Sequence, residues 1–234
     1  ARAVGECERI LFGAAGQPQA LRDEAFEVWT EALAALGDYP ALALAWQRKR
    51  GLMAQVHGAG STPAALCAVE LANTLVTLGQ THAAGAAWTE ALDSARGLVE
   101  KRDLGAWVVL TRAALVATTP AQRQRTADLA VASVPQMGGR VNPDDQAQRD
   151  IARKFMIALA SMRIEMGEPG DAVGMLRAAV QFVHPDIAVN DPQTGEISAV
   201  MGRAYLAGGK LPEARQFLGY ALDKLKAAYG DNNP

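Results

Sequence analysis

The 234-residue sequence predicts an all-α fold in which short antiparallel helix pairs follow one another and stack into an array. Three observations lead to this prediction: the composition, a two-helix motif near the C-terminal end, and the return of that motif along the chain. Apolar residues make up 50% of the sequence, whereas Phe, Trp and Tyr together reach only 6%. An alanine-rich chain with few aromatic residues favours close-packed helices over a β-sheet.

The clearest helix pair covers residues 197–222. Gly202 is followed three residues later by Tyr205, a glycine-rich turn comes next, and Ala214 and Ala221 lie seven residues apart on the second helix. Small residues at a helix crossing let the two axes approach closely. The larger apolar residues expected to fill the space between the helices are Met201, Tyr205, Leu218 and Leu222.

The alanine that opens the second helix recurs with a regular period. Equivalent positions are Leu42, Ala84, Ala127, Ala172 and Ala214, at spacings of 42, 43, 45 and 42 residues. Self-similarity of this length is typical of stacked arrays, in which each unit buries its apolar face on the next. Leu42 replaces the expected alanine, so the first unit departs from the motif.

The first two units have complete helix pairs. Unit one is indicated by Phe26, Trp29, Leu33, the turn at Gly37 to Pro40, and Trp46. Unit two is indicated by Leu71, Ala72, Leu75, the turn at Gly79, then Ala84, Trp88 and Ala91. Proline suits the first turn of a helix, where its missing N–H has no helical partner. We therefore expect helices to begin near Pro40 and near Pro63, the second capped by Ser61 or Thr62.

The remaining units follow the same period less evenly. Unit three has Trp107, Leu110, Ala114 and Leu115, then Thr119-Pro120, Ala127, Val131 and Val134, but no turn glycine, so its register is open by a few residues. Unit four begins at Asn142-Pro143-Asp144-Asp145 and contains Met156, Leu159, Gly167, Ala172, Leu176 and Ala179. A longer loop at residues 184–192 leads to the unit at 197–222.

This set of motifs resembles the tetratricopeptide repeat (TPR), in the long-repeat form of about 42 residues found in kinesin light chains. The tail Gly230-Asp231-Asn232-Asn233-Pro234 is similar to the loop between such repeats. The resemblance implies a right-handed superhelical solenoid of antiparallel helix pairs. We expect residues 1–19 to form a partial helix or cap, and residues 20–234 to form one domain of about five repeats.

The resemblance also implies a binding surface, because the first helix of each unit lines a concave groove in such arrays. The position after the small residue of that helix would face the groove, and Asn73 there could pair with a peptide backbone through its donor and its acceptor. Glu27 and Glu31 would make one half of the groove acidic, and Arg112, Lys154 and Arg203 the other half basic. The predicted partner-binding residues are Asn73, Arg203, Arg112, Glu31, Glu27, Ser161 and Lys154. The alternative is that these residues form the solvated side of amphipathic helices.

Several other classes of protein find little support. The formal net charge of −2 shows no overall excess of positive charge of the kind that binds nucleic acid. The three histidines lie in separate loops without zinc spacing, and no cofactor or metal site is expected. Cys7 and Cys67 fit small buried residues in a reducing compartment. No apolar run approaches the ~20 residues that cross a bilayer. The chain opens as if mid-protein, so we expect a fragment, cytoplasmic or else a periplasmic domain of a membrane-anchored regulator.

We therefore expect a non-catalytic module that binds a protein or peptide segment in its groove. Arrays of this kind are common as the sensing parts of bacterial signalling proteins such as serine/threonine kinases, which this Ala-, Gly- and Arg-rich chain resembles. The main alternative is a scaffold that packs on its own parent protein or on a second copy. A hydrolase or transferase has no supporting set of residues.

Overall fold

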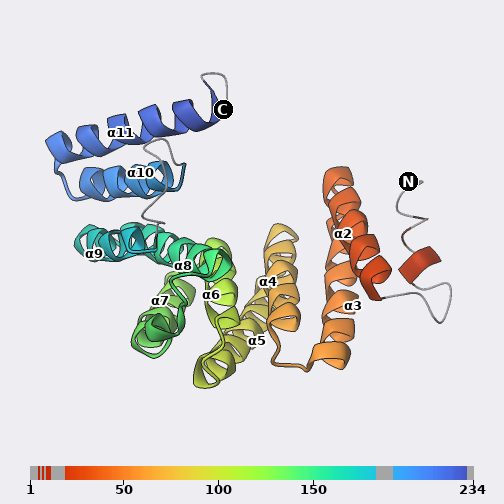
Figure 1. Cartoon of the computed structure of the whole chain (residues 1–234). Helices are drawn as coiled ribbons and strands as arrows, with labels where there is room; N and C mark the ends of the chain where they lie inside the picture. Colours follow the sequence, from red (N-terminus) through yellow and green to blue (C-terminus); the bar gives the residue numbers. More distant parts are fainter. Residues whose placement is uncertain (1–4, 6, 8, 12–18, 183–191, 231–234) are drawn as a thin grey trace. The chain divides into compact units, whose positions relative to one another are not determined.

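The computed structural model describes residues 5, 7, 9–11, 19–182 and 192–230, and every regular element in these residues is helical. Consecutive helices fold back on one another as antiparallel pairs (Figure 1). The pairs are α2 (Gln19–Leu36) with α3 (Tyr39–His57), α4 (Thr62–Thr77) with α5 (Thr81–Glu100), α6 (Gly105–Val116) with α7 (Pro120–Met137), α8 (Gln146–Glu165) with α9 (Pro169–Val180), and α10 (Pro192–Ala207) with α11 (Leu211–Tyr229). A 3₁₀ turn, η1 (Gly138–Arg140), follows α7. Within these ranges no helix is long and apolar enough to cross a membrane.

The chain divides into two compact units, residues 1–97 and residues 98–234, with the boundary near the end of α5. Unit 1 contains α2, α3, α4 and most of α5. Unit 2 contains the helices from α6 to α11. The expected loop at 184–192 and the tail motif at 230–234 lie largely outside the described residues.

A common turn joins the two helices of four pairs. Gly37, Gly79, Gly167 and Gly209 have φ angles of 69°, 70°, 82° and 72°. In each case the residue after the glycine donates its backbone N–H to the carbonyl five residues earlier, as Asp38 does to Leu33 at 3.0 Å. A positive φ at this position favours glycine over residues with a side chain. These turns fix the register of four pairs, and the pair α6–α7 has no such glycine.

The residues predicted at the helix crossings, four alanines and Leu42, are buried. Ala127 and Ala172 are 0% exposed, Ala84 and Ala214 are 2% exposed, and Leu42 is 6% exposed. A Cβ atom added to Gly202 would lie 2.6 Å from Cγ of Leu218, so α10 and α11 approach too closely for a larger residue. The predicted period and fold class are confirmed.

Two of the predicted apolar positions do not fill a core. Leu222 is 54% exposed, because it follows the buried Ala221 by one residue and therefore points about 100° away from it around α11. Val131 is 40% exposed, because the buried side of α7 is formed instead by Ala127, Ala130, Ser133 and Met137. The prediction that Leu222 packs between the paired helices was wrong, and Val131 keeps the spacing of its unit without being buried.

The expected helix starts are present. Thr119 and Gln122 form a capping box at the beginning of α7, with Pro120 in its first turn. The Asp145 side chain accepts the backbone N–H of Gln148 at the start of α8. Ser61 stands at the cap position of α4, but its side chain makes no capping hydrogen bond. Side-chain caps therefore define some of the boundaries that the turn glycines leave open.

Candidate functional site

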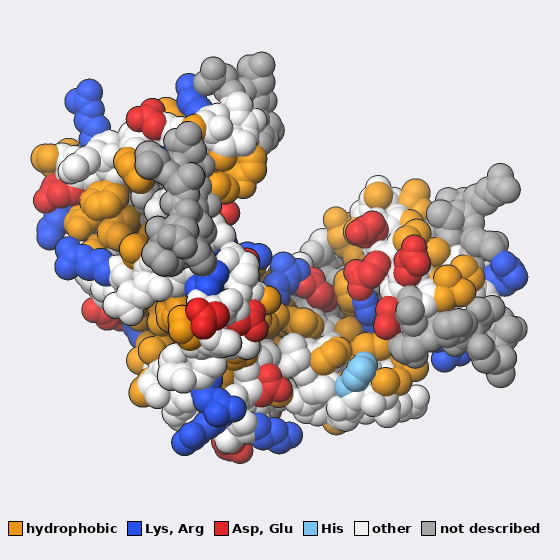
Figure 2. All heavy atoms as spheres, viewed as in Figure 1, with side chains coloured by type: hydrophobic (Ala, Val, Ile, Leu, Met, Phe, Trp, Pro, Cys, Tyr) orange, Lys and Arg blue, Asp and Glu red, His pale blue; other side chains and the backbone are white. Residues whose placement is uncertain are grey.

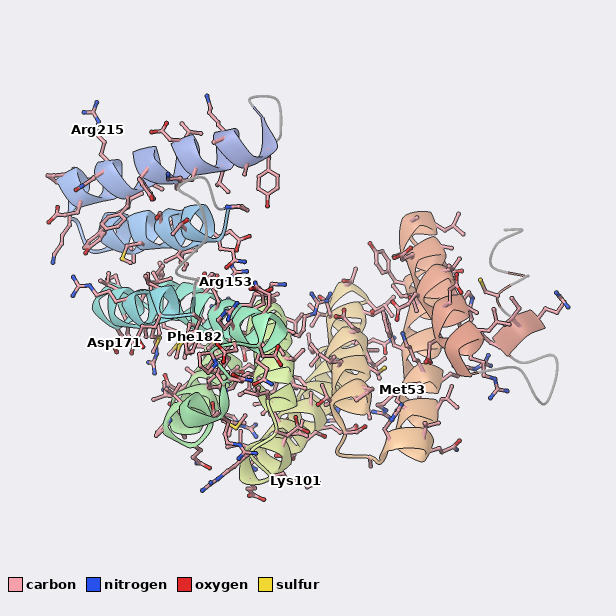
Figure 3. All side chains as sticks on the ribbon, in the orientation of Figure 1. Met53, Lys101, Arg153, Asp171, Phe182 and Arg215 are labelled. Carbon is pink, nitrogen blue, oxygen red and sulfur yellow. The ribbon has the colours of Figure 1, made fainter. Side chains whose placement is uncertain are left out.

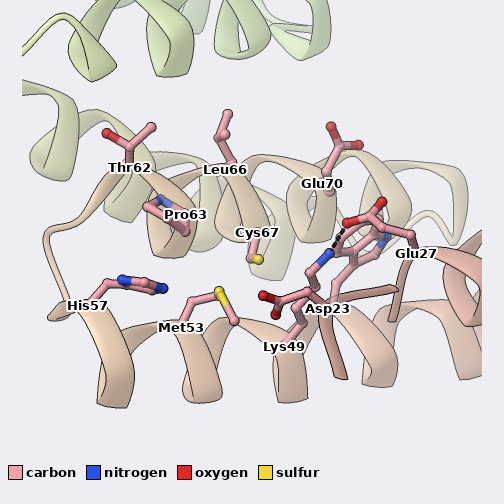
Figure 4. Close-up of a pocket in the computed structure, with 11 residues that line it drawn as sticks. Asp23, Glu27, Lys49, Met53, His57, Thr62, Pro63, Leu66, Cys67 and Glu70 are labelled. Carbon is pink, nitrogen blue, oxygen red and sulfur yellow. Dashed lines mark hydrogen bonds and ion pairs between the residues drawn. The ribbon is translucent and has the colours of Figure 1, made fainter. Parts of the chain in front are cut away.

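A pocket of about 430 Å³ lies inside unit 1, between the first helices α2 and α4 and above the second helix α3 (Figure 4). The three helices come from two neighbouring repeats. The lining residues are Asp23, Glu27, Trp46, Lys49, Met53, His57, Thr62, Pro63, Leu66, Cys67 and Glu70. A pocket of this volume falls within the range seen for binding sites in proteins.

The floor of the pocket is apolar. Met53 on α3 and Cys67 on α4 are 5% and 4% exposed, and they point toward one another across the cavity (Figure 4). Pro63 and Leu66 on α4 are half-buried beside them. A carbon chain placed against these side chains would be removed from water, which favours binding.

The rim of the pocket carries an excess of negative charge. Asp23 and Glu27 come from α2 and Glu70 from α4, whereas Lys49 is the one Lys or Arg in the lining. With His57 neutral, the lining therefore has a formal charge of −2. Acidic side chains gather over α2 and α3 in the space-filling view (Figure 2).

Lys49 is an unusual residue for its place in the fold. It lies twelve residues after the turn glycine of its pair, where the α5, α9 and α11 helices have Ala91, Ala179 and Ala221. Lys49 is only 8% exposed; its ammonium group pairs with the Glu27 carboxylate and lies 5.3 Å from the Trp46 ring centroid. A carboxylate and an aromatic face both stabilise a buried cation.

Cys67 is a neutral thiol rather than a nucleophile. Burial raises its pKa to about 11 from the ordinary value of 9.0; Lys49, Glu27 and the other charges nearby have smaller effects. Because the thiolate is the reactive form, this thiol reacts slowly near neutral pH. Cys67 and Cys7 are both buried. The described residues contain no cluster of three or more His, Cys, Asp or Glu side chains that could hold a metal.

Unit 2 has an equivalent place between the successive first helices α8 and α10, and there the space is occupied by an ion pair. Arg153 lies fourteen residues before its turn glycine, as Asp23 does in α2, and Glu196 lies thirteen residues before its own, as Leu66 does in α4. Arg153 (labelled in Figure 3) is 4% exposed and donates to Glu196 at 2.5 Å. Asp150 lies 3.6 Å from the same guanidinium group.

A second cavity in unit 1, of about 530 Å³, lies against α3, α4 and α5. Its two charged lining residues, Arg50 and Glu90, form an ion pair at 2.6 Å, so they largely neutralise one another. We therefore treat the pocket between α2 and α4, whose lining combines apolar and mostly acidic side chains, as the candidate site.

The structure distributes the predicted partner-binding residues over both units. Glu27 lines the pocket, and Glu31 and Asn73 are exposed on α2 and α4, each six residues before its turn glycine. In unit 2, Arg112 on α6, Lys154 on α8 and Arg203 on α10 are exposed, and Ser161 on α8 is half-buried. Of the seven, Glu27 alone belongs to the pocket, and a shared groove for the others stays a prediction.

Sequence reasoning missed most of the pocket. Asp23, Lys49, Met53, Cys67 and Glu70 were not predicted as binding residues, since their meeting depends on how three helices pack. One signal was available: a lysine at 49 interrupts the small-residue position that three other second helices fill with alanine. A charged residue at a helix crossing requires partners, and these partners would have indicated the pocket.

Comparison with known proteins gives matches in structure but not in sequence. No protein-family profile matches the chain, and no curated protein matches it. A kinesin light chain of Podosopora anserina with nearly identical TPR-like repeats is similar, with a TM-score of 0.66 at 15% identity, over 92% of this chain and 99% of that chain. Its Q17M variant gives 0.66 at 14% identity, over 88% and 96%. BtubC (BKLC) of P. vanneervenii gives 0.63 at 15% identity, over 100% and 90%. The chain therefore has the TPR-like fold, an all-α solenoid of helix pairs.

Proposed function

We propose that this chain is a non-catalytic protein-interaction module that binds an extended segment of a partner protein along its first helices. The observation that carries the proposal is the pocket of about 430 Å³ between α2 and α4, which offers an apolar floor and a charged rim. One side chain of the segment would enter this pocket and anchor the rest.

The neighbouring exposed residues of unit 1 suit the backbone of such a segment. Backbone groups buried on binding need hydrogen-bond partners, because leaving them unpaired costs free energy. The Asn73 side chain is exposed on α4 and offers both a donor and an acceptor. Glu31 holds the equivalent position on α2 and can accept from a backbone N–H. Arg112, Lys154, Ser161 and Arg203 are proposed to make further contacts in unit 2.

The proposal extends to the protein's context. The composition is similar to that of bacterial regulators in which a repeat array senses a ligand or partner. We place the module in a bacterial signalling protein such as a serine/threonine kinase, in the cytoplasm. The TPR-like fold supports the interaction role at the level of architecture.

The test is selection of binding peptides. A phage library of random 12-residue peptides is selected on the full 234-residue chain, and the selected peptides are synthesised and measured by fluorescence anisotropy. Leu66→Trp is designed to fill the pocket, whereas Leu36→Trp makes the same type of change at a site that is 63% exposed on α2. We expect Leu66→Trp to weaken binding at least tenfold and Leu36→Trp to leave it unchanged. Peptides that bind both variants equally would refute the pocket as the anchor.

A scaffold that associates with a second copy is the alternative, and one observation favours it. Leu176 on α9 and Leu218 on α11 hold the same position after their turn glycines, yet Leu176 is 0% exposed and Leu218 is 38% exposed. Leu222 and Tyr229, each 54% exposed, extend the apolar surface along α11. Apolar surface of this kind can mark an interface. A concentration-dependent dimer in light scattering that Leu222→Glu abolishes would favour the scaffold.

A further inference from the structure

We infer that a slot in unit 2, between α9 and the C-terminal end of α10, binds a phosphoryl group through Arg177 and Lys210. The slot has a volume of about 160 Å³. This is smaller than most sites for whole small molecules, so the slot suits a single charged group rather than a nucleotide. The inference goes beyond the proposed function, because it concerns a second site that lies wholly in unit 2.

The charge of the slot is the first support. Arg177 and Lys210 are its charged lining residues, so the lining has a formal charge of +2. Within the part of the chain that the structure describes, neither side chain forms an ion pair with a carboxylate. A phosphoryl group carries a charge of about −1.5 to −2 near pH 7, whereas a carboxylate carries a single negative charge. The two cations therefore match a phosphoryl group better than a carboxylate.

The carboxylates that are close in sequence do not belong to the slot. Glu168, the residue before α9, is paired with Arg163. Asp171 precedes the slot residue Val173 by two positions, so it lies about 200° away from it around α9. Glu213 is exposed in the first turn of α11 and does not line the slot. The cationic lining thus contains no acidic side chain.

The space itself depends on a glycine before the turn of the last pair. The residue before the turn glycine is large in the other three pairs with such a turn: Leu36, Leu78 and Met166. In the pair α10–α11 it is Gly208. A Cβ atom added to Gly208 would lie 3.7 Å from Cγ of Pro169 at the start of α9. The glycine therefore keeps the slot between α10 and α9 open.

The position after the turn glycine supplies the first cation. In the other three pairs this position is acidic or neutral: Asp38, Gln80 and Glu168. In the last pair it is Lys210, whose backbone N–H donates to the Tyr205 carbonyl at 2.9 Å and whose ammonium lies 6.0 Å from the Tyr205 ring centroid. The Tyr205 ring in turn stacks on Phe217 at 5.3 Å. The turn and the two rings thus hold Lys210 at the slot, and the Tyr205 hydroxyl is a further donor in the lining.

The second cation comes from the facing helix. Pro169, Val173 and Arg177 follow one another at four-residue spacing, so they lie on one side of α9. Side chains on a helix lean toward its N-terminus, and this lean directs Arg177 toward the end of the slot where Gly208 and Lys210 lie. A guanidinium group presents a planar fork of donors that matches two phosphate oxygens. A phosphoryl group in the slot would therefore receive one cation from each wall.

The test is isothermal titration calorimetry of the full 234-residue chain with N-acetyl-phosphoserine amide, inorganic phosphate and N-acetyl-aspartate amide. We expect both phosphates to bind, and the aspartate derivative to bind at least tenfold more weakly. Arg177→Gln and Lys210→Gln should each weaken phosphate binding about tenfold, as for loss of a charge-assisted hydrogen bond. Arg215→Gln removes an exposed cation of α11 outside the slot (labelled in Figure 3) and should leave binding unchanged.

A second pair of variants tests the space rather than the charge. Gly208→Leu introduces the side chain that the pairs α2–α3 and α4–α5 have at this position, and it should abolish phosphate binding. Gly219→Leu is the matched control, because a Cβ atom added there meets nothing within 4 Å, and binding should be retained. Thermal unfolding of each variant checks that the fold is retained.

The outcomes also identify the source of the phosphoryl group. Tighter binding of the phosphoserine derivative would support the site as one for a phosphorylated protein side chain, and tighter binding of inorganic phosphate would support it as one for the free ion. Aspartate binding as tight as that of phosphoserine would overturn the inference. Phosphate affinities indifferent to both cation variants, or no binding of either phosphate, would also overturn it.

Discussion

The spaces between successive first helices differ in the two units of this molecule, although their backbone register is the same. Between α8 and α10 the Arg153–Glu196 ion pair fills the space, and between α2 and α4 Asp23 and Leu66 line an open pocket. The turns at Gly37, Gly79, Gly167 and Gly209 place these residues equivalently. The repeat thus provides a location, and a few side chains decide whether that location is filled by the chain itself or left open.

The largest expected effect is the loss of stability when the Arg153 side chain is removed from the space between α8 and α10. Arg153→Ala would leave the Asp150 and Glu196 carboxylates without their cation. We expect a loss of about 3 kcal/mol in the free energy of unfolding, near the low end for a broken buried pair, since both carboxylates are partly exposed. Urea unfolding measures it, with the exposed Arg140→Ala as the control. Equal stability of the two variants would show that Arg153 does not hold α8 and α10 together.

The next effect tests whether water is excluded from the floor of the pocket, where Cys67 lies. The pKa of Cys67 is about 11 in the folded chain and 9.0 ordinarily, so the neutral thiol stabilises the fold fully below pH 9. As pH rises from 9 toward 11, the unfolded thiol ionises first and this stability is lost, by about 2–3 kcal/mol in total. The measurement is urea unfolding of the wild type relative to Cys67→Ala across this window. A constant difference between the two proteins would mean that water reaches the floor.

A smaller effect tests the register on which the comparison depends. Ala214 is buried where α10 and α11 cross, so Ala214→Leu should overpack the crossing and destabilise the chain by ~1–3 kcal/mol. Ala227→Leu makes the same change at an exposed position of α11 and should be nearly neutral. Thermal unfolding reports both. If the two variants melt alike, the assignment of Ala214 to the crossing is wrong.

The smallest effect on stability comes from closing the pocket in the manner of unit 2. Asp23→Arg with Leu66→Glu transfers the Arg153–Glu196 pair to the equivalent positions. We expect a gain of only ~0.5–1 kcal/mol from the new pair, since its surroundings are partly exposed. Loss of peptide binding should accompany it, whereas Asp23→Arg alone should lose binding without gaining stability. Retained binding in the double variant would break the proposed equivalence of the two places.

The fold could be predicted from the sequence because the features that determine it lie close together along the chain. A turn glycine followed five residues later by a buried alanine recurs in the pairs α4–α5, α8–α9 and α10–α11. Both features act within one helix pair. In the pair α6–α7 the glycine is missing, and there the sequence left the register open by a few residues. Leu222 was misplaced for a different reason: one residue separates it from Ala221, and only the packed helices show which of the two faces α10.

The pocket was much harder to predict from the sequence, because it depends on the packing of three helices at once. Glu27 was predicted as a binding residue from its place on the first helix. Asp23 and Glu70 look like ordinary solvated charges along their helices, and Cys67 looks like a core residue. Of these lining residues, only Lys49 stands out in the sequence, because it replaces the alanine found at the equivalent position of three other second helices. The proposed contacts of Asn73, Arg112, Lys154, Ser161 and Arg203 remain predictions.

The shared turn glycine has a consequence for how such an array diversifies. Because it keeps four pairs on one register, two substitutions between neighbouring first helices can exchange a closed interior for an open pocket, with the backbone unchanged. Duplication of a repeat would copy the location but not the specificity, which point mutations could then set anew in each copy. A chain of this type can acquire several independent recognition sites in series, each evolving at the cost of a few side chains.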